Sequence, residues 1–343
     1  MSAAPIQLTE LDATIEGLLV GRPMAQGQRM LGVEVEHLLL HRTTRRSAPL
    51  DFCQQLLAEL AKDFGASELR DGEVLSKIRA DGFGMSMEPG GQVEFDTEPA
   101  GRLDLVEERV QKIMSRAVER LAKTDYELVA LGHAPVTPVE ELGLLPRTRY
   151  DIMNREMVRR GRLSRSMMRA TAGFQLAYDF ADKADAARKL VLLNRLSPLL
   201  VAISANSREI AGRDSGYASY RHAVWLETDT CRSGVPTGGM DVETALPGYI
   251  EWAKSAIALF RHGDGADAEL IATPAVPFVE LVAEGVIDRA DLELHLSSLF
   301  PLVRLRDYLE VRCLDAVEWP LARSMAALLS GLVYCDDAFA KAS

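Results

Sequence analysis

The chain has 343 residues, of which 48% are hydrophobic, 6% aromatic and 26% charged, a composition typical of a globular protein with a large apolar core. It carries 39 Lys and Arg against 50 Asp and Glu, and the formal net charge of -11 disfavours phosphate-rich partners such as nucleic acid or an anionic membrane. Four widely spaced cysteines form no CxxC pair, which disfavours a disulfide framework or a structural zinc site. The composition therefore favours small-molecule chemistry.

No stretch of the sequence reaches the ~18 uncharged apolar residues that a membrane-spanning helix needs. The first residues have neither the basic region nor the apolar region of a secretory leader. We therefore expect a cytoplasmic protein that acts on small molecules and has neither nucleic acid nor membrane as a partner. The sequence carries no signal for an oligomeric state.

Hydrophobic periodicity separates expected helices from expected strands. Along the first half it predicts, in order, a helix at 8–20, a strand at 30–41, a helix at 50–64, strand arms at 85–97, a helix at 103–123, a strand at 126–131 and a loop at 132–146. Beyond that it predicts a strand at 174–180, a helix at 183–205 interrupted by Pro198, a long loop at 206–239, helices at 247–260 and 291–299, a strand at 303–313 and a helix at 316–332. Pro89-Gly90-Gly91 gives the arms at 85–97 the turn of a hairpin or bent strand.

The chain shows no internal repeat, low-complexity tract or linker, so we expect one α+β domain over residues 1–343. The strands are unevenly separated and include a hairpin signal. This pattern predicts a mainly antiparallel sheet backed by helices rather than a regular βαβ series.

Two acidic strand faces are candidates for metal binding. In the segment GVEVE, Glu34 and Glu36 are two residues apart on a strand, so their carboxylates leave the same face about 6.5–7 Å apart along the chain. Glu88 and Glu94 flank the Pro-Gly-Gly turn, and Glu94 shares its face with Asp96. Hard oxygen ligands suit Mg²⁺. Each motif alone is more often the solvated face of a strand, and only the combination favours a metal site.

The strand pattern near the C-terminus places arginines around one carboxylate. Its polar face holds Arg304, Arg306, Tyr308, Glu310 and Arg312. Guanidinium groups grip phosphate or carboxylate oxygens in a bidentate manner, so such a strand suits an anionic ligand beside a metal. The alternative is an exposed edge strand that pairs with the protein's many acids.

Two further segments are candidates for ligand contacts. Eight arginines fall between Arg147 and Arg169, where a solvated helix face is the simpler interpretation and an anion site the alternative. The segment 217–234 contains Arg221, Trp225 and Arg232 without amphipathic order, as loops that contact substrates often do. The sequence contains no dinucleotide fingerprint, P-loop or nucleophile elbow.

Six segments, taken in order, resemble the motifs of family 2 of the glutamate–cysteine ligases, the plant-type and actinobacterial enzymes. They are GVEVE (32–36), MEPGGQVEF (87–95), MMRATAGFQLAYDF (167–180), ANS (205–207), YASYRHAVWLETDTCRSG (217–234) and RLRDYLEVRCLD (304–315). The second and fifth are the specific ones. Together they span most of the chain.

This resemblance implies a glutamine-synthetase-like catalytic domain, in which a curved antiparallel sheet holds Mg²⁺ and ATP on its concave face. It also implies the family reaction, in which glutamate is activated as γ-glutamyl phosphate and the amine of cysteine displaces phosphate to give γ-glutamylcysteine for glutathione or another thiol. A related ligase with a different amine acceptor is the alternative. A catalytically silent binding protein on the same scaffold is a third hypothesis, against which the clustered, mutually repelling carboxylates count.

The resemblance also assigns roles to individual residues. The residues assigned to Mg²⁺ and the phosphates it carries are Glu34, Glu36, Glu88, Glu94 and Glu310. Arg312 would stabilise the transferred phosphoryl group as a catalytic residue together with Glu310, and Arg304 and Arg306 would bind the nucleotide. The candidates for the amino-acid pocket are Thr171, Gln175, Arg221, Trp225 and Arg232.

Overall fold

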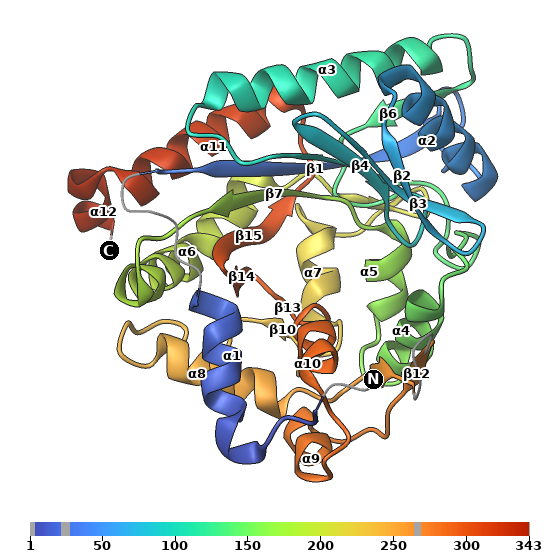
Figure 1. The fold of residues 1–343 in the computed structure, drawn as a ribbon. Helices are drawn as coiled ribbons and strands as arrows, with labels where there is room; N and C mark the ends of the chain where they lie inside the picture. Colours follow the sequence, from blue (N-terminus) through green and yellow to red (C-terminus); the bar gives the residue numbers. More distant parts are fainter. Residues whose placement is uncertain (1–3, 22–27, 264–268, 343) are drawn as a thin grey trace.

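The structure is a computed structural model that describes residues 4–21, 28–263 and 269–342 (Figure 1). Its main strands are β1 (Leu31–His41), β2 (Ser67–Asp71), β3 (Val74–Ala80), β4 (Phe83–Met87), β5 (Val93–Thr97), β6 (Tyr126–Val129), β7 (Gly173–Tyr178), β14 (Val303–Arg306) and β15 (Tyr308–Asp315). These nine strands form one sheet in the order β14-β15-β7-β1-β5-β4-β3-β2, and β6 pairs with the far end of β1. Every pairing in this sheet is antiparallel.

Helices cover both faces of this sheet. They are η1 (Leu8–Glu10), α1 (Leu11–Val20), α2 (Leu50–Phe64), α3 (Leu103–Leu121), α4 (Thr148–Val158), α5 (Ser164–Ala170), α6 (Lys183–Ser204), α7 (Tyr220–Leu226), α8 (Ala245–Ser255), α9 (Phe278–Ala283), α10 (Arg289–Leu296), α11 (Trp319–Tyr334) and α12 (Asp336–Ala342). In Figure 1, α3 and α11 lie above the sheet, whereas α4, α5, α7, α8, α9 and α10 lie below it.

Three short two-stranded ribbons complete the described residues. Their strands are β8 (Glu209–Ile210) with β9 (Arg213–Asp214), β10 (Ser233–Gly234) with β13 (Phe300–Pro301), and β11 (Phe260–His262) with β12 (Leu270–Ala272). The first two ribbons involve the long loop predicted at 206–239, which also contains the short helix α7.

Alternation along each central strand sends apolar and polar side chains to opposite faces of the sheet. On β1, Val33 and Val35 are buried while the intervening glutamates are only half-buried. Helix α3 packs against β1, β4 and β5, and it buries a stripe of residues at helical spacing. Because the apolar side chains of the strands and α3 form one hydrophobic core, the polar residues of the same strands are left on the opposite face.

Most of the expected elements are present. The helix expected at 50–64 has those bounds and ends at Gly65, which adopts a left-handed conformation with φ 58°. The arms at 85–97 form the antiparallel hairpin of β4 and β5. Helix α6 continues through Pro198, so the expected interruption is wrong. The helix expected at 247–260 ends at Ser255, and Phe260 instead begins β11.

The strand expected at 303–313 is two strands. The chain reverses at Asp307, so that Arg304 faces Glu310 across the β14–β15 hairpin and Arg306 faces Tyr308. Aspartate favours turns because its side chain bonds to nearby backbone groups. The reversal is therefore consistent with the residue found at its centre.

Strands β2 and β3 have no counterpart among the expected elements, although the sequence carries a signal for them. The dipeptide Asp71-Gly72 lies at the reversal between β2 and β3, and Asp81-Gly82 connects β3 to β4. Asp-Gly between alternating runs is a strong hairpin signal because its glycine readily adopts positive φ. Gly72 has φ 60° and Gly82 has φ 83°.

The turn Pro89-Gly90-Gly91 packs tightly against the segment before β7. A Cβ atom added at Gly90 would lie 2.1 Å from the backbone oxygen of Arg169, so only glycine fits this approach. The side chain of Gln92 joins the same two segments, because its Nε2 donates to the carbonyl of Thr171 at 2.8 Å. The turn thus fixes the position of Glu88, which immediately precedes it.

This contact predicts the effect of adding one methyl group. We expect Gly90→Ala to lower the free energy of unfolding by about 2 kcal/mol or more, because the new atom meets rigid backbone. The matched control is Gly331→Ala on α11, where a Cβ meets nothing within 4 Å. That substitution should raise the free energy of unfolding by about 0.5–1 kcal/mol through helix propensity. Equal stability of the two variants in urea unfolding would contradict this account of the turn.

Candidate active site

The register of three adjacent strands brings acidic side chains together on one face of the sheet. Glu34 lies opposite Asp96 of β5 on one side and opposite Gln175 of β7 on the other. Glu36 lies opposite Glu94 of β5. Directly opposed residues have Cβ atoms about 4.5–5.5 Å apart, so these side chains are neighbours. The two acidic strand faces expected from the sequence are thus one surface, which we call the carboxylate face: Glu34, Glu36, Glu88 and Glu94.

The electrostatic environment of the carboxylate face disfavours its own charge. Burial, with added repulsion from Glu36 and Glu34, raises the pKa of Glu88 to about 7. Burial, with repulsion from Glu88 and Glu36, raises the pKa of Glu94 to about 8. Burial also raises the pKa of Glu34 and of Glu36. None of the four forms an ion pair with a lysine or arginine within the described residues, so positive charge must come from elsewhere if all four are to ionise.

Neutral hydrogen-bond donors orient two members of the face. The backbone N–H of Gly173 donates to Glu36 Oε2 at 2.5 Å, and Gln175 Nε2 donates to Glu36 Oε1 at 3.1 Å. Ser86 Oγ donates to Glu94 Oε1 at 2.7 Å. Each donor comes from a neighbouring strand, so the sheet itself fixes the two carboxylates.

Glu310 differs from the other carboxylates because two arginines enclose it. Arg304 Nε lies 2.6 Å from Glu310 Oε2, and Arg312 Nη1 lies 2.9 Å from the same oxygen. Burial alone would raise the pKa of Glu310, but the two guanidinium groups outweigh burial and lower the pKa to about 2. Arg312 Nη1 also donates to Gln175 Oε1 at 2.5 Å. Gln175 therefore connects the arginine pair to Glu36.

A second cationic group, on strand β3, lies on the other side of the face. Lys77 Nζ lies 2.9 Å from Asp96 Oδ2, and Arg79 pairs with Asp96 Oδ1. Arg79 reaches this partner by crossing β4 at Gly84, where a Cβ atom would lie 2.7 Å from Arg79 Nη1. The sequence patterns predict no role for Lys77 or Arg79, because they do not predict strand β3.

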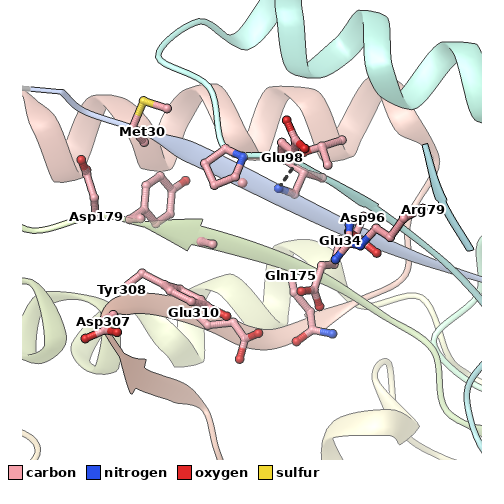
Figure 2. A pocket seen from close by; sticks show the side chains of 16 residues that line it. Met30, Glu34, Arg79, Asp96, Glu98, Gln175, Asp179, Asp307, Tyr308 and Glu310 are labelled. Atoms are coloured by element: carbon pink, nitrogen blue, oxygen red, sulfur yellow. Dashed lines mark hydrogen bonds and ion pairs between the residues drawn. The ribbon is translucent and has the colours of Figure 1, made fainter. Parts of the chain in front are cut away.

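A cavity of about 510 Å³ opens beside these groups. Figure 2 shows Glu34, Gln175 and Glu310 towards one end and Met30 and Asp179 towards the other. Its lining combines acidic and amide side chains with apolar surface. A cavity of this size and character is typical of small-ligand sites.

Helix α7 brings Arg221 and Trp225 to the edge of the site. The Nη2 atom of Arg221 donates to the carbonyl of Arg312 at 3.1 Å. Its Nε and Nη1 atoms are buried without hydrogen-bond partners in the described residues, as is Nε1 of Trp225. Burial lowers the pKa of Arg221, while the charges of Asp315 and Glu36 oppose that effect. Buried donors without acceptors are costly, so this corner suits a ligand oxygen or a water.

Asp315, for which the sequence predicts no role, holds α7 in place. Ser207 Oγ and Ser219 Oγ donate to its carboxylate at 2.6 and 2.8 Å. Ser207 Oγ in turn accepts from the backbone N–H of Arg221 at 3.0 Å. The last residue of β15 thus positions the backbone from which Arg221 extends.

The structure does not bring three of the selected residues to the carboxylate face. Arg232 is fully buried and its guanidinium bonds to Asp229, Ser298 and Ile257. Thr171 is buried and donates its hydroxyl to the carbonyl of Met167 at 2.6 Å. Arg306 is exposed near the tip of the β14–β15 hairpin. Ligand contacts by these three residues stay predictions.

The arginine-rich segment 147–169 is not simply a solvated helix face. Arg149 donates to the hydroxyl and the carbonyl of Ser297 at 3.0 and 3.1 Å and lies over the ring of Phe260. Burial lowers the pKa of Arg149 to about 10. Tyr150 is also buried, and burial together with the charge of Glu88 raises its pKa. The first turn of α4 therefore lies within electrostatic reach of the carboxylate face.

The donor set of the carboxylate face fits a divalent cation that arrives with its ligand. The four half-buried carboxylates form no ion pair with a lysine or arginine in the described residues, and hard oxygen ligands suit Mg²⁺. No three His, Cys, Asp or Glu side chains in residues 4–21, 28–263 and 269–342 are close enough to form a complete metal cage. Mg²⁺ usually takes only one or two carboxylates and completes its shell with water and substrate phosphates, so such a cage is not required.

Comparison with known proteins identifies the family. Residues 30–342 match the model of glutamate–cysteine ligase family 2 (GCS2), and the chain belongs to that family. It is 27% identical over 314 residues to the chloroplastic glutamate–cysteine ligase of Brassica juncea, across 90% of this chain and 60% of that protein. A chloroplastic glutamate–cysteine ligase A of Oryza sativa subsp. indica is 27% identical over 315 residues, across 90% of this chain and 63% of that protein. The chain therefore spans about 60% of the length of the first of these relatives.

The fold also has a counterpart among solved structures. The crystal structure of glutamate–cysteine ligase from Francisella tularensis in complex with AMP aligns with a TM-score of 0.53, over 92% of this chain and 68% of that chain. The two sequences are 11% identical, so the likeness concerns the fold alone. It confirms the expected α+β class with a mainly antiparallel sheet backed by helices. Among the described residues, no helix has the length and apolar character needed to cross a bilayer.

The raised pKa values predict how stability depends on pH. Folded Glu94, with a pKa of about 8, keeps a proton that the unfolded chain releases near the ordinary value of 4.5. Stability is therefore lost as pH rises between these two values, because the unfolded state binds fewer protons. We expect Glu94→Gln to raise the melting temperature at pH 8 by several degrees and to raise it much less at pH 5.5.

The control for this measurement is Glu280→Gln, which removes the same charge from an exposed position on α9. Thermal unfolding without metal or nucleotide, at both pH values, gives the comparison. A stabilisation by Glu94→Gln that is the same at pH 5.5 and pH 8 would show that Glu94 has an ordinary pKa.

Proposed function

We propose that the chain is an ATP-dependent carboxylate–amine ligase that joins the side-chain carboxylate of glutamate to the amine of cysteine. A carboxylate oxygen of glutamate attacks the γ-phosphorus of ATP and displaces ADP, which forms γ-glutamyl phosphate. The amine then attacks the acyl carbon, phosphate leaves with the C–O bonding electrons, and the amine loses a proton. The proposed ligands are small molecules and the proposed location is the cytoplasm; the product would serve glutathione or another thiol.

One observation carries this proposal: uncompensated carboxylates and an arginine pair meet across Gln175 on one face of the sheet. Arg312 contacts both Gln175 and Glu310, and Gln175 contacts Glu36. Phosphoryl transfer needs positioning and charge neutralisation more than covalent chemistry from the protein. The carboxylates can bind a cation and the arginines can bind the transferring phosphoryl group, so the site can both position the reactants and neutralise their charge. Family membership supports the same chemistry.

The carboxylate face is the proposed site of Mg²⁺, which when bound neutralises the charge of the nucleotide phosphates. Glu34, Glu36, Glu88 and Glu94 are the candidate ligands; one or two of them would bind a given ion directly, and water and the nucleotide phosphates would complete its shell. Glu310 is already neutralised by Arg304 and Arg312, so we infer that it orients these arginines and contributes less to the metal than the other four. Arg312 would face the transferred phosphoryl group, where a guanidinium fork matches phosphate oxygens.

Loss of one carboxylate should abolish turnover without unfolding the protein. We expect Glu36→Gln and Glu94→Gln to reduce ADP formation by about a hundredfold or more, the scale on which removal of a group that stabilises transferring charge acts. The control is Glu119→Gln, which removes an exposed charge from α3 on the other side of the sheet. Excess chelator should stop ADP formation by the unaltered protein. Normal turnover in both variants, or full activity with chelator, would remove the metal assignment.

The amine acceptor is tested by ADP release with glutamate and each of the twenty amino acids in turn. We expect cysteine to give the highest rate. A higher rate with another amine would favour the alternative of a γ-glutamyl ligase with a different acceptor. No nucleotide turnover with any acceptor would favour a binding protein on the same scaffold.

The acyl-phosphate step predicts a specific pattern of inhibition. A sulfoximine analogue of glutamate offers a nitrogen that can be phosphorylated, so it should inhibit tightly only after incubation with ATP and metal. The site is arranged for charge that appears during transfer, and the phosphorylated analogue carries that charge. Arg312→Lys should weaken this inhibition more than it weakens glutamate binding, because an ammonium cannot replace the guanidinium fork. Equal potency with and without ATP in the unaltered protein would contradict the mechanism.

A further inference from the structure

The last residue of helix α11 joins two segments that line the cavity. Tyr334 Oη donates to the carbonyl of Met30 at 2.6 Å and also contacts Asp179 Oδ1. The backbone N–H of Asp179 donates back to Tyr334 Oη at 3.1 Å. Met30 immediately precedes β1 and Asp179 immediately follows β7, so one phenol holds together the neighbouring ends of two central strands.

A buried lysine of α6 reinforces this arrangement from behind. Lys189 Nζ donates to the carbonyl of Asp179 at 3.0 Å, pairs with Asp185 at 2.9 Å, and lies 4.7 Å from the centroid of the Tyr334 ring. The backbone and one carboxylate oxygen of Asp179 are thereby fixed. Within the described residues, no hydrogen bond is found for its other carboxylate oxygen, Oδ2, and Asp179 lines the cavity.

The position of Asp179 in the cavity indicates what its free oxygen would bind. Figure 2 shows Asp179 and Met30 at one end of the cavity, away from Glu34 and Gln175. If the phosphates of a nucleotide lie near the carboxylate face and the arginines, the cavity leaves room for its ribose and base towards Asp179. Between the two ends the lining includes Gly32 and Ala177, which carry little or no side chain; a Cβ atom at Gly32 would lie 3.3 Å from the Cβ of Ala177. Ribose hydroxyls are donors that need acceptors, and a carboxylate oxygen is an acceptor.

We propose that Asp179 accepts a hydrogen bond from the ribose diol of the nucleotide, and that Tyr334 is the positioning residue that aims it. This inference rests on the proposed use of ATP. It gives helix α11 a part in nucleotide recognition, although α11 packs on the face of the sheet opposite the carboxylates.

The test compares binding of ATP and 2′,3′-dideoxy-ATP by calorimetry on the full chain, with Mg²⁺ present and glutamate omitted so that no turnover occurs. The unaltered protein should bind ATP about tenfold more tightly than the dideoxy nucleotide, as expected for a hydrogen bond to a charged acceptor. Asp179→Ala should weaken ATP to the level of the dideoxy nucleotide and leave the latter unchanged. Tyr334→Phe, which keeps the ring, should reduce the preference for ATP by about threefold.

The matched control is Tyr126→Phe on β6, which removes a hydroxyl from the strand partner of His41 at the opposite end of β1. It should leave both affinities unchanged. Equal binding of the two nucleotides by the unaltered protein would overturn the inference while leaving the proposed function in place. The inference would also be overturned if the variants bound ATP and the dideoxy nucleotide more weakly by the same factor, because general damage to the cavity gives that result. Failure of the unaltered protein to bind either nucleotide would overturn the proposed function as well.

Discussion

Repulsion among carboxylates that share one face of a sheet is the constraint on which the rest of this structure depends. Burial and mutual repulsion raise the pKa values of Glu88 and Glu94 to about 7 and 8. A chain selected for stability alone would pair these groups or replace them. The hydrophobic core above the sheet must offset their effect, as is common where a site is arranged for a ligand rather than for the empty protein.

The surrounding structure holds this unfavourable arrangement in place. Strand pairing sets the spacing of the carboxylates, and donors from β4 and β7 orient Glu94 and Glu36. The Pro-Gly-Gly turn fixes Glu88 against the Arg169 backbone. Arg304 and Arg312 bond to Glu310, and Arg312 also bonds to Gln175, so these guanidinium groups are ordered without forming ion pairs with the four glutamates. The charges of a bound ligand would therefore meet carboxylates and arginines that are already held in position. Such fixed groups are the basis of electrostatic preorganisation.

The sequence predicted the carboxylate face because strand alternation depends only on the spacing of residues along a strand. The same rule explains why the polar face near the C-terminus was predicted correctly although the strand expected at 303–313 is a hairpin. Asp307 is the centre of the β14–β15 hairpin, and partners such as Arg304 and Glu310 are equally distant from it. A straight strand and a hairpin thus give the same assignment of faces, so the polar face was identified although the reversal was not.

Other features depend on contacts between distant segments and could not be derived from local patterns. The partners of Arg232 come from three separate segments, and its enclosure is visible only in the folded chain. Asp315 was passed over because a single aspartate at the end of a strand has no distinctive spacing. Lys77 and Arg79 are a different case, since the Asp-Gly dipeptides on either side of β3 predict that strand and with it their approach to Asp96.

The central claim is that this face activates a carboxylate by phosphorylation. The most direct measurement follows oxygen from glutamate labelled with ¹⁸O in its side-chain carboxylate, incubated with ATP, Mg²⁺ and cysteine. If γ-glutamyl phosphate forms, one labelled oxygen must leave with phosphate when the amine displaces it. We therefore expect one ¹⁸O atom in each released inorganic phosphate, in step with formation of the amide. Amide formation accompanied by unlabelled phosphate would contradict the account.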